Sequence, residues 1–215
     1  MKLSEGQKAI APYIGKRFGD FLEPDLLTDL RTNKGNVGQL LERLIGLNNT
    51  SNNLDFEDGE LKTNKCDKNG KPLETVFITQ ISNIVDELLS GKKFETTHLY
   101  EKIGNLLYVP VSKVGSESEW MLLGAIHIRL DDPQFSDLKT QLSKDYYSIV
   151  QQLNNHIASS PDGFIHTSNG YFIQIRSKDS KPYHPIYSNI YNKYVSNKNH
   201  AFYFKKEFAQ YFLAK

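Results

Sequence analysis

The chain has a single cysteine, Cys66, among its 215 residues. One thiol excludes an internal disulfide and any zinc site built from several thiolates. Long apolar runs are also missing, because the longest, residues 120–126, is far shorter than the ~18 residues that a membrane-spanning helix needs. The first residues, M-K-L-S-E-G-Q-K, lack the apolar centre of a signal peptide. We therefore expect a cytoplasmic globular protein.

Several familiar catalytic signatures are absent from the sequence as well. It contains no glycine-rich phosphate loop, no H-E-x-x-H zinc motif and no G-x-S-x-G nucleophile turn. The composition is otherwise ordinary, with 39% hydrophobic and 24% charged residues, and its length allows one large domain or two small ones. Any catalytic chemistry has to come from other combinations of side chains.

The net charge of +1 hides an uneven distribution. Residues 160–215 carry eight Lys or Arg side chains against three acids, and they hold seven of the twelve tyrosines. Basic residues interleaved with tyrosines form a surface that can meet phosphates and bases. A tyrosine-rich sheet region with solvated lysines has the same composition, so both interpretations stay open at this point.

Hydrophobic periodicity predicts strands in the middle of the chain, with helices before, between and after them. We expect helices over residues 23–32, 34–46, 94–103, 132–158 and 205–214, and strands over residues 59–66, 74–81, 105–112, 120–128, 163–166, 170–177 and 200–204. The Asn69-Gly70 pair favours a tight hairpin turn between the first two strands. This order is typical of an α/β protein with a central mixed sheet flanked by helices.

The stretch L-D-F-E-D-G-E-L-K, residues 54–62, has the most suggestive polar pattern. In an extended strand Glu60 and Lys62 point to one face, while Leu61 enters the core. With Asp55 just before them, two carboxylates and one ammonium would meet at a strand end. Such a set can hold Mg²⁺ and a water against a phosphodiester, which suggests a magnesium-dependent DNA endonuclease. By itself, acid-x-Lys on a strand is more often a solvated face.

Seven longer segments raise the significance of that stretch. They are K-G-N-V-G-Q-L-L-E-R-L-I-G, D-F…E-L-K-T, G-K-P-L-E-T-V-F-I, F-E-T-T-H-L-Y-E-K, L-L-Y-V-P-V, G-Y-F-I-Q-I-R-S-K and A-F-Y-F-K-K-E-F. In this order, from about residue 34 to residue 213, the chain resembles the MutH-like endonucleases. That family contains a mismatch-repair nicking enzyme and related GATC-cutting type II restriction enzymes.

The resemblance implies a restriction-endonuclease-like fold and one or two Mg²⁺ ions. It implies metal-binding roles for Asp55, Glu60 and Glu42, and catalytic roles for Lys62 and a second lysine, Lys102. Periodicity alone treats Glu42 as an ordinary surface acid, because it lies outside the apolar stripe of its helix. The spacing between Asp55 and Glu60 is two residues shorter than in the mismatch-repair member, so Asp58 is an alternative metal ligand.

Double-stranded DNA is the partner that the resemblance implies. Lys34 matches a DNA-contacting lysine, Arg176 and Lys178 match a recognition pair, and Tyr203 matches a recognition tyrosine. In the strand at 170–177, alternation places Tyr171, Ile173 and Ile175 on one face, and Phe172, Gln174 and Arg176 on the other. If the first set packs inward, Gln174 and Arg176 face the DNA, with Lys205 and Lys206 as candidate phosphate contacts.

The sequence is compatible with two functions within the family, restriction cleavage and mismatch-repair nicking, and two alternatives lie outside it. We expect a single endonuclease domain over residues 1–215, or two lobes of it around a DNA cleft. Type II restriction cleavage favours a homodimer on DNA, whereas a mismatch-repair nickase can act as a monomer with a repair partner. A catalytically silent DNA-binding module would not need Asp55, Glu60 and Lys62 together. An unrelated domain with a solvated acidic hairpin does not explain the seven ordered segments.

Overall fold

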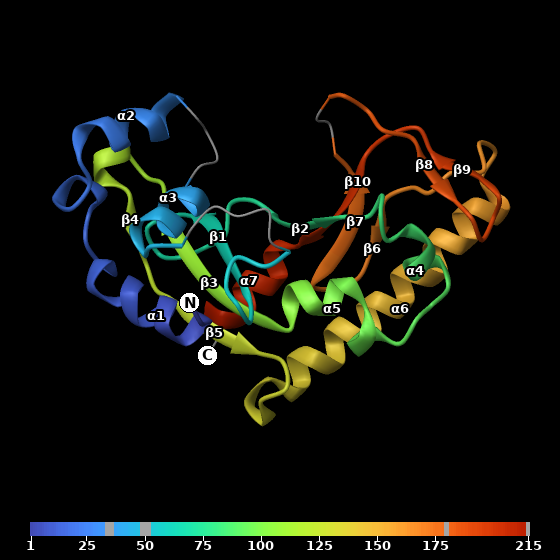
Figure 1. Ribbon diagram of the computed structural model, residues 1–215, viewed down its shortest axis with the longest axis horizontal. Helices are drawn as coiled ribbons and strands as arrows, with labels where there is room; N and C mark the ends of the chain where they lie inside the picture. Colours follow the sequence, from blue (N-terminus) through green and yellow to red (C-terminus); the bar gives the residue numbers. More distant parts are fainter. Residues whose placement is uncertain (33–36, 48–52, 179–180, 214–215) are drawn as a thin grey trace. The chain divides into compact units, whose positions relative to one another are not determined.

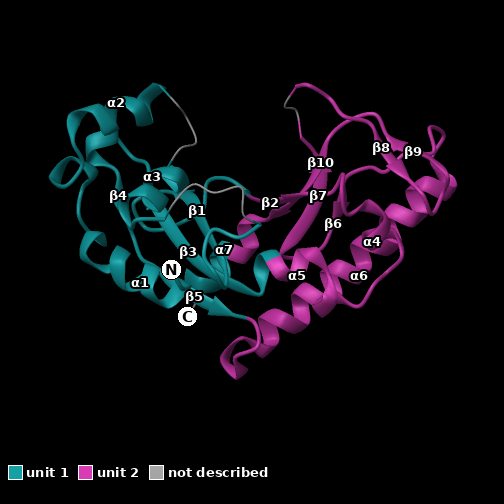
Figure 2. Cartoon of the chain, viewed as in Figure 1, with its two compact units in different colours: residues 1–76, 102–129, 209–215 teal, residues 77–101, 130–208 magenta. Residues whose placement is uncertain are grey.

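The protein was analysed as a computed structural model, which describes residues 1–32, 37–47, 53–178 and 181–213 (Figure 1). The chain divides into two compact units, shown in two colours in Figure 2. Unit 1 comprises residues 1–76, 102–129 and 209–215, and unit 2 comprises residues 77–101 and 130–208. Within the described ranges, the helices are all too short or too polar to span a membrane.

Unit 1 is built on a mixed four-stranded sheet. Its strands are β1 (Glu60–Cys66), β3 (Asn105–Ser112), β4 (Met121–Leu122) and β5 (Ile126–Arg129). Strand β1 runs parallel to β3, with Lys62 beside Tyr108, and both β4 and β5 pair with β3 in the antiparallel sense. The single strand predicted over residues 120–128 is therefore two short strands that meet different parts of β3.

Helices cover both faces of this sheet. The N-terminal helices are α1 (Leu3–Ile10), α2 (Pro24–Thr32) and α3 (Val37–Leu44), with 3₁₀ turns at Ala11–Tyr13, Phe18–Asp20 and Glu117–Glu119. Leu3, Leu41 and Leu61 belong to one buried cluster, so α1 and α3 pack on the face that Leu61 enters. On the other face, the Phe212 ring at the end of α7 (Lys206–Leu213) lies 5.8 Å from the Tyr108 ring. The mixed sheet with flanking helices is confirmed.

Unit 2 contains a second four-stranded sheet and a separate pair of strands. The strand order is β2 (Val76–Gln80), β10 (His200–Phe204), β7 (Ile173–Ser177) and β6 (Ser168–Asn169), and β8 (Ile186–Ser188) pairs with β9 (Lys193–Ser196). Its helices are α4 (Val85–Leu89), α5 (His98–Ile103) and α6 (Ser136–Ser159), with 3₁₀ turns at Phe94–Thr96 and Pro133–Phe135. The stripe predicted for the long helix is buried in α6, as Leu138, Leu142, Tyr146, Ile149 and Leu153 show.

The predicted hairpin between the first two strands is wrong. A turn does form, because the Gly70 N–H donates to the Asp67 carbonyl at 3.1 Å and Gly70 has a φ of +83°. The returning chain pairs with β1 only through an isolated bridge at Pro72 and one bond from the Leu73 N–H. Proline has no N–H to extend the ladder, and β2 joins β10 in the other sheet. Likewise, the strand expected over residues 163–166 is absent, and β6 follows instead.

A buried carboxylate connects α6 to the start of β7. Asp145 is 2% exposed, and its two oxygens accept backbone N–H bonds from Tyr171 at 2.8 Å, Phe172 at 2.6 Å and Ile173 at 3.2 Å. A Cβ at Gly170 would lie 2.4 Å from the Asp145 carboxyl carbon, so only glycine allows this approach. The strand that carries the predicted recognition residues is thus fixed by a charge-assisted network.

Candidate active site

Strand β1 shows the alternation predicted for it. Glu60 is 2% exposed and Leu61 is 5% exposed, and Leu61 packs in the core of unit 1. Because successive side chains point to opposite faces, Glu60, Lys62 and Asn64 share the other face of the strand. The acid-x-Lys pair is therefore not a solvated strand face, since its carboxylate is buried.

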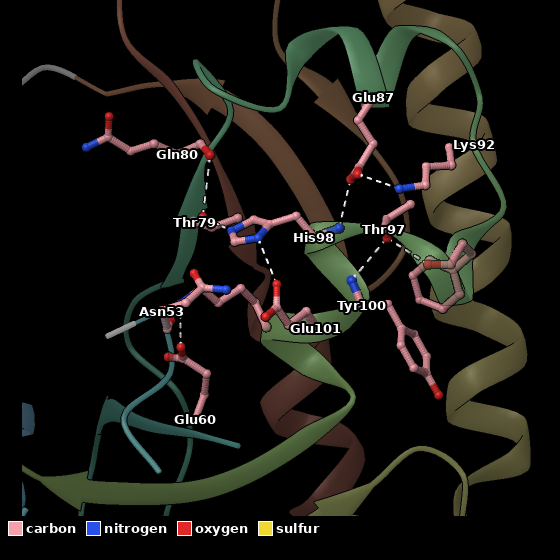
Figure 3. A network of polar contacts seen from close by, with 12 residues as sticks. Asn53, Glu60, Thr79, Gln80, Glu87, Lys92, Thr97, His98, Tyr100 and Glu101 are labelled. Carbon is pink, nitrogen blue, oxygen red and sulfur yellow. Dashed lines mark hydrogen bonds and ion pairs between the residues drawn. The ribbon is translucent and has the colours of Figure 1, made fainter. Parts of the chain in front are cut away.

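Two lysines donate to the buried carboxylate of Glu60. Lys62 reaches Glu60 Oε2, and Lys102 Nζ lies 2.6 Å from Glu60 Oε1. Lys102 also donates to the backbone carbonyl of Asn53; this residue and Glu60 are both labelled in Figure 3. The structure thus brings together three of the predicted site residues, one of them far away in the sequence.

Helix α5 sets the position of Lys102, which lies in its last turn. The Thr97 hydroxyl, just before the helix, accepts a hydrogen bond from the Tyr100 N–H at 3.1 Å, as an N-cap residue does. The Glu87 carboxylate accepts the N–H of His98 at 2.7 Å (Figure 3). The His98 ring contacts Thr79 and Glu101 at 3.3 and 3.1 Å, which is a structural role.

Asp55 and Asp58 point to different elements. Asp55 Oδ2 accepts the N–H of Leu61 at 2.9 Å, which joins the loop to the start of β1. Asp58 Oδ1 instead accepts the N–H of Leu3 at 2.8 Å, at the first turn of α1. A turn closed by the Phe56 N–H and the Gly59 carbonyl, 2.9 Å apart, accommodates the shortened spacing. This geometry favours Asp55 over Asp58 as the site carboxylate.

Electrostatics couple Glu42 to the same set of residues. Burial raises the pKa of Glu42, the charges of Asp55 and Glu60 raise it further, and Lys62 opposes them. Burial also raises the pKa of Glu60, with Lys62 opposing and Asp55 adding to the effect. Glu42 is half-buried on α3. Glu42 is therefore not a fully solvated acid, as periodicity implied, and its metal-binding role stays a prediction.

The donor set fits a hard divalent cation. Asp55, Glu60 and Glu42 offer the carboxylate oxygens that Mg²⁺ prefers, and a cation would relieve the repulsion that raises two of their pKa values. In the described part of the chain, however, no three His, Cys, Asp or Glu side chains are gathered closely enough to form a metal site. Both Glu60 oxygens are held by ammonium groups, so binding an ion there requires at least one lysine to move.

The predicted recognition residues lie in unit 2, except Lys34, which is outside the described residues. Ile173 and Ile175 are fully buried and Arg176 is exposed, as expected. The alternation fails before β7 begins, because Tyr171 is 58% exposed and Phe172 is buried. Two of the other predicted contacts lie near aromatic side chains of unit 2: Gln174 is opposite Tyr203 in the sheet, and the Lys178 ammonium lies 4.9 Å from the centroid of the Phe77 ring. Lys205 donates to the Gly170 carbonyl at 3.0 Å, and Lys206 is exposed.

One contact in this group orients the predicted base reader. The Arg176 guanidinium lies 4.3 Å above the Tyr203 ring centroid, a cation–π distance. Stacking on the ring favours one orientation of the planar guanidinium. This contact was not predicted from the sequence, although the register that places Tyr203 opposite Gln174 explains it.

Comparisons with known proteins match part of the chain. Residues 46–120 match the family model of the DNA mismatch repair enzyme MutH. This segment of the chain is similar to that family. That match includes Asp55, Glu60, Lys62 and Lys102. Lys34 and Glu42 lie before it, and the predicted DNA contacts of unit 2 lie after it. The match agrees with the resemblance over those residues, and the mixed sheet with flanking helices agrees with the predicted fold class.

Individual relatives show the same similarity. DNA mismatch repair protein MutH from Pectobacterium atrosepticum is 33% identical over 112 residues, which cover 51% of this chain and 47% of the relative. The protein of that name from Haemophilus influenzae is 35% identical over 112 residues, covering 51% and 48%. Its counterpart from Yersinia pestis is 40% identical over 86 residues, covering 39% and 36%. The chain thus matches at most about half the length of these curated relatives.

The raised pKa of Glu42 predicts a pH-dependent stability effect. A carboxyl whose folded pKa lies above its unfolded pKa binds its proton more tightly when folded, so it costs stability as pH rises through both values. Glu42→Gln cannot ionise. We expect it to raise the melting temperature at neutral pH, with a gain that disappears by about pH 4, where the wild-type carboxyl is protonated too.

Thermal melts across this pH range check the effect. Glu74→Gln, which removes an exposed acid of unit 1, is the control and should leave the melting temperature nearly unchanged. A lower melting temperature for Glu42→Gln at neutral pH would show that Glu42 stabilises the fold, which contradicts its placement among repelling carboxylates.

Proposed function

We propose that the chain is a magnesium-dependent, sequence-specific DNA endonuclease that hydrolyses phosphodiester bonds at GATC. The observation that carries the proposal is the buried Glu60 carboxylate, which contacts Lys62 and Lys102 and is electrostatically coupled to Asp55 and Glu42. A structural role alone does not explain why two lysines contact one buried carboxylate while Asp55 and Glu42 are electrostatically coupled to it. The MutH-like match over residues 46–120 supports the same chemistry.

Each residue of this group has a proposed role. Asp55 and Glu60, with Glu42 directly or through water, would hold one or two ions. A bound Mg²⁺ neutralises charge on a phosphate and lowers the pKa of a water. Lys62 would orient the attacking water or hydroxide, and Lys102 would support the negative charge that develops on the phosphate oxygens. Burial strengthens the electrostatic interactions among these groups, because the local dielectric is lower than that of water.

The basic residues of unit 2 would read and hold the DNA. We propose Arg176 as the residue that donates to the O6 and N7 atoms of guanine, with its plane fixed by Tyr203. Lys178 and Gln174 would contact bases or phosphates beside it, and Lys34 and Lys206 would contact phosphates. Since Lys205 donates to a backbone carbonyl, we give it a smaller share of DNA binding. In this proposal residues 1–215 serve as one endonuclease domain.

Two modes of cleavage belong to this proposal. Type II restriction cleavage of both strands needs two active sites, which a homodimer on palindromic DNA supplies. Strand nicking needs one active site and a monomer, with a mismatch-repair partner to activate it. The names of the curated relatives favour the second mode. The richness of the chain in asparagine and lysine suggests an AT-rich genome and is weak support for the first mode.

Removing the strand lysine separates cleavage from binding. Lys62→Ala should lower the cleavage rate by at least about 100-fold, the usual cost of one charge-stabilising donor. DNA affinity should change little, because a single internal lysine makes a small part of the phosphate contacts. Plasmid cleavage and duplex binding are measured on the same preparation. Cleavage at the wild-type rate would overturn the role of Lys62, and Lys65→Ala on the opposite face of β1 is the matched control.

A pair of aspartate variants decides between the two candidate ligands. Asp55→Asn should abolish cleavage, because it removes a charge beside Glu60 and Glu42. Asp58→Asn should remain active, since Asp58 bonds the first turn of α1. Cleavage assays with melting curves for both variants provide the comparison. An inactive but stable Asp58→Asn beside an active Asp55→Asn would move the metal role to Asp58.

Recognition is tested through the affinity ratio between two duplexes. Arg176→Ala should weaken binding to a GATC duplex by roughly 1–3 kcal/mol more than binding to a scrambled duplex. Lys206→Ala should weaken both equally and reduce the salt dependence, as a phosphate contact does. Binding is measured at two salt concentrations. Equal losses on both duplexes for Arg176→Ala would make it a phosphate contact.

A further inference from the structure

Asn64 presents a buried acceptor without a partner on the face of β1 that holds Glu60 and Lys62. The residue is 2% exposed, and its Nδ2 donates to the Tyr108 hydroxyl at 3.0 Å. Among the described residues, its Oδ1 is the only buried side-chain nitrogen or oxygen atom that lacks a hydrogen-bond partner. Leaving such a group unsatisfied typically costs about 1–3 kcal/mol, so it calls for a physical explanation.

The surroundings hold the Asn64 amide in one position. Tyr108 is 2% exposed and lies beside Lys62 on the neighbouring strand, with the Phe212 ring next to it. Burial raises the pKa of Tyr108, so its hydroxyl stays neutral and accepts the Asn64 N–H. The amide nitrogen is therefore used to fix the side chain, and the amide oxygen stays available as an acceptor.

Lys62 lies between two acceptors on this face. Glu60 precedes it by two residues and Asn64 follows it by two, each a step of roughly 6.6 Å along the strand. The flexible four-carbon stem of lysine can span that distance in either direction. In the present structure Lys62 donates to Glu60, which leaves Asn64 without a donor.

We propose that Asn64 is the positioning residue for Lys62. When a divalent cation binds Glu60 and displaces the Lys62 ammonium, Asn64 Oδ1 accepts a hydrogen bond from that ammonium. The inference rests on the proposed function, because it assumes that a cation binds Glu60. Lys62 then stays next to the scissile phosphate with one hydrogen bond fixed to protein and two N–H donors left for the water and the phosphate. Neither the acid-x-Lys pattern nor the family resemblance assigns Asn64 a role.

A double-mutant cycle of calcium binding tests the proposal on the whole chain without DNA. Calorimetric titration with Ca²⁺ is made for the wild type, Asn64→Leu, Lys62→Met and the double variant. Asn64→Leu should weaken Ca²⁺ binding roughly tenfold, the cost of one hydrogen bond to a charged group, because Lys62 then keeps competing for Glu60. In the Lys62→Met background, the same change should have no effect, because no ammonium competes.

Several outcomes overturn the proposal. If Asn64→Leu changes the Ca²⁺ affinity equally in the wild-type and Lys62→Met chains, Asn64 has a structural role or its Oδ1 binds a water instead of Lys62. Thr63→Val, on the opposite face of β1, is the matched control and should leave Ca²⁺ binding unchanged. If Asn64→Leu does not fold, the wild-type structure with Ca²⁺ decides: Lys62 Nζ should lie within hydrogen-bonding distance of Asn64 Oδ1, and a lysine still on Glu60 contradicts the proposal.

The same titration separates this inference from the proposed function. If Glu60→Gln binds Ca²⁺ as tightly as the wild type and the wild type does not cleave DNA, both the endonuclease proposal and the role of Asn64 fail. If the wild type binds Ca²⁺ through Glu60 and cleaves DNA while the cycle is additive, only the role of Asn64 fails.

Discussion

The burial of the Glu60 carboxylate is the constraint on which the site depends. A carboxylate that is 2% exposed has lost most of its hydration, and the raised pKa of Glu60 records that loss. Lys62 and Lys102 offset the cost by placing two positive charges on its oxygens. Such an arrangement is weak evidence for stability, because replacing a buried ion pair with apolar groups is often neutral or stabilising. This is why we assign the arrangement a chemical role in the proposed function.

The charged groups of the proposed site come from four separate segments of unit 1. Strand β1 supplies Glu60 and Lys62, the end of α5 supplies Lys102, the loop before β1 supplies Asp55, and α3 supplies Glu42. Close packing against α1 positions the loop that carries Asp55. A Cβ at Gly6 would lie 2.3 Å from the Phe56 ring, so glycine in α1 lets the Asp55 loop pack against that helix. The site therefore depends on packing that is distant from the charged groups in sequence.

The periodicity of hydrophobic residues predicted part of the site. The family resemblance named further residues, Glu42 and Lys102 among them. The period of two placed Leu61 in the core and Glu60 beside Lys62, because that period is a property of any strand. The period of 3.6 found the buried stripe of α6 but left Glu42 on the surface, since it measures hydrophobicity and not proximity to other acids. The Asn69-Gly70 turn was found, yet the strand after it pairs with β10, a partner more than a hundred residues away. The open acceptor of Asn64 depends on the register of β1 with β3 and has no signal in the sequence.

Cleavage of plasmid DNA tests the central claim, that these carboxylates and lysines form a metal-dependent nuclease site. The purified chain is incubated with Mg²⁺ and with plasmids whose GATC sites are methylated, hemimethylated or unmethylated, and a Glu60→Gln chain is treated in parallel. The account predicts nicked or linear DNA from the wild type, dependent on Mg²⁺ and on GATC sites, and intact plasmid from Glu60→Gln. Equal cleavage by both chains, or intact plasmid of all three kinds from a folded wild-type chain that binds DNA, would contradict it.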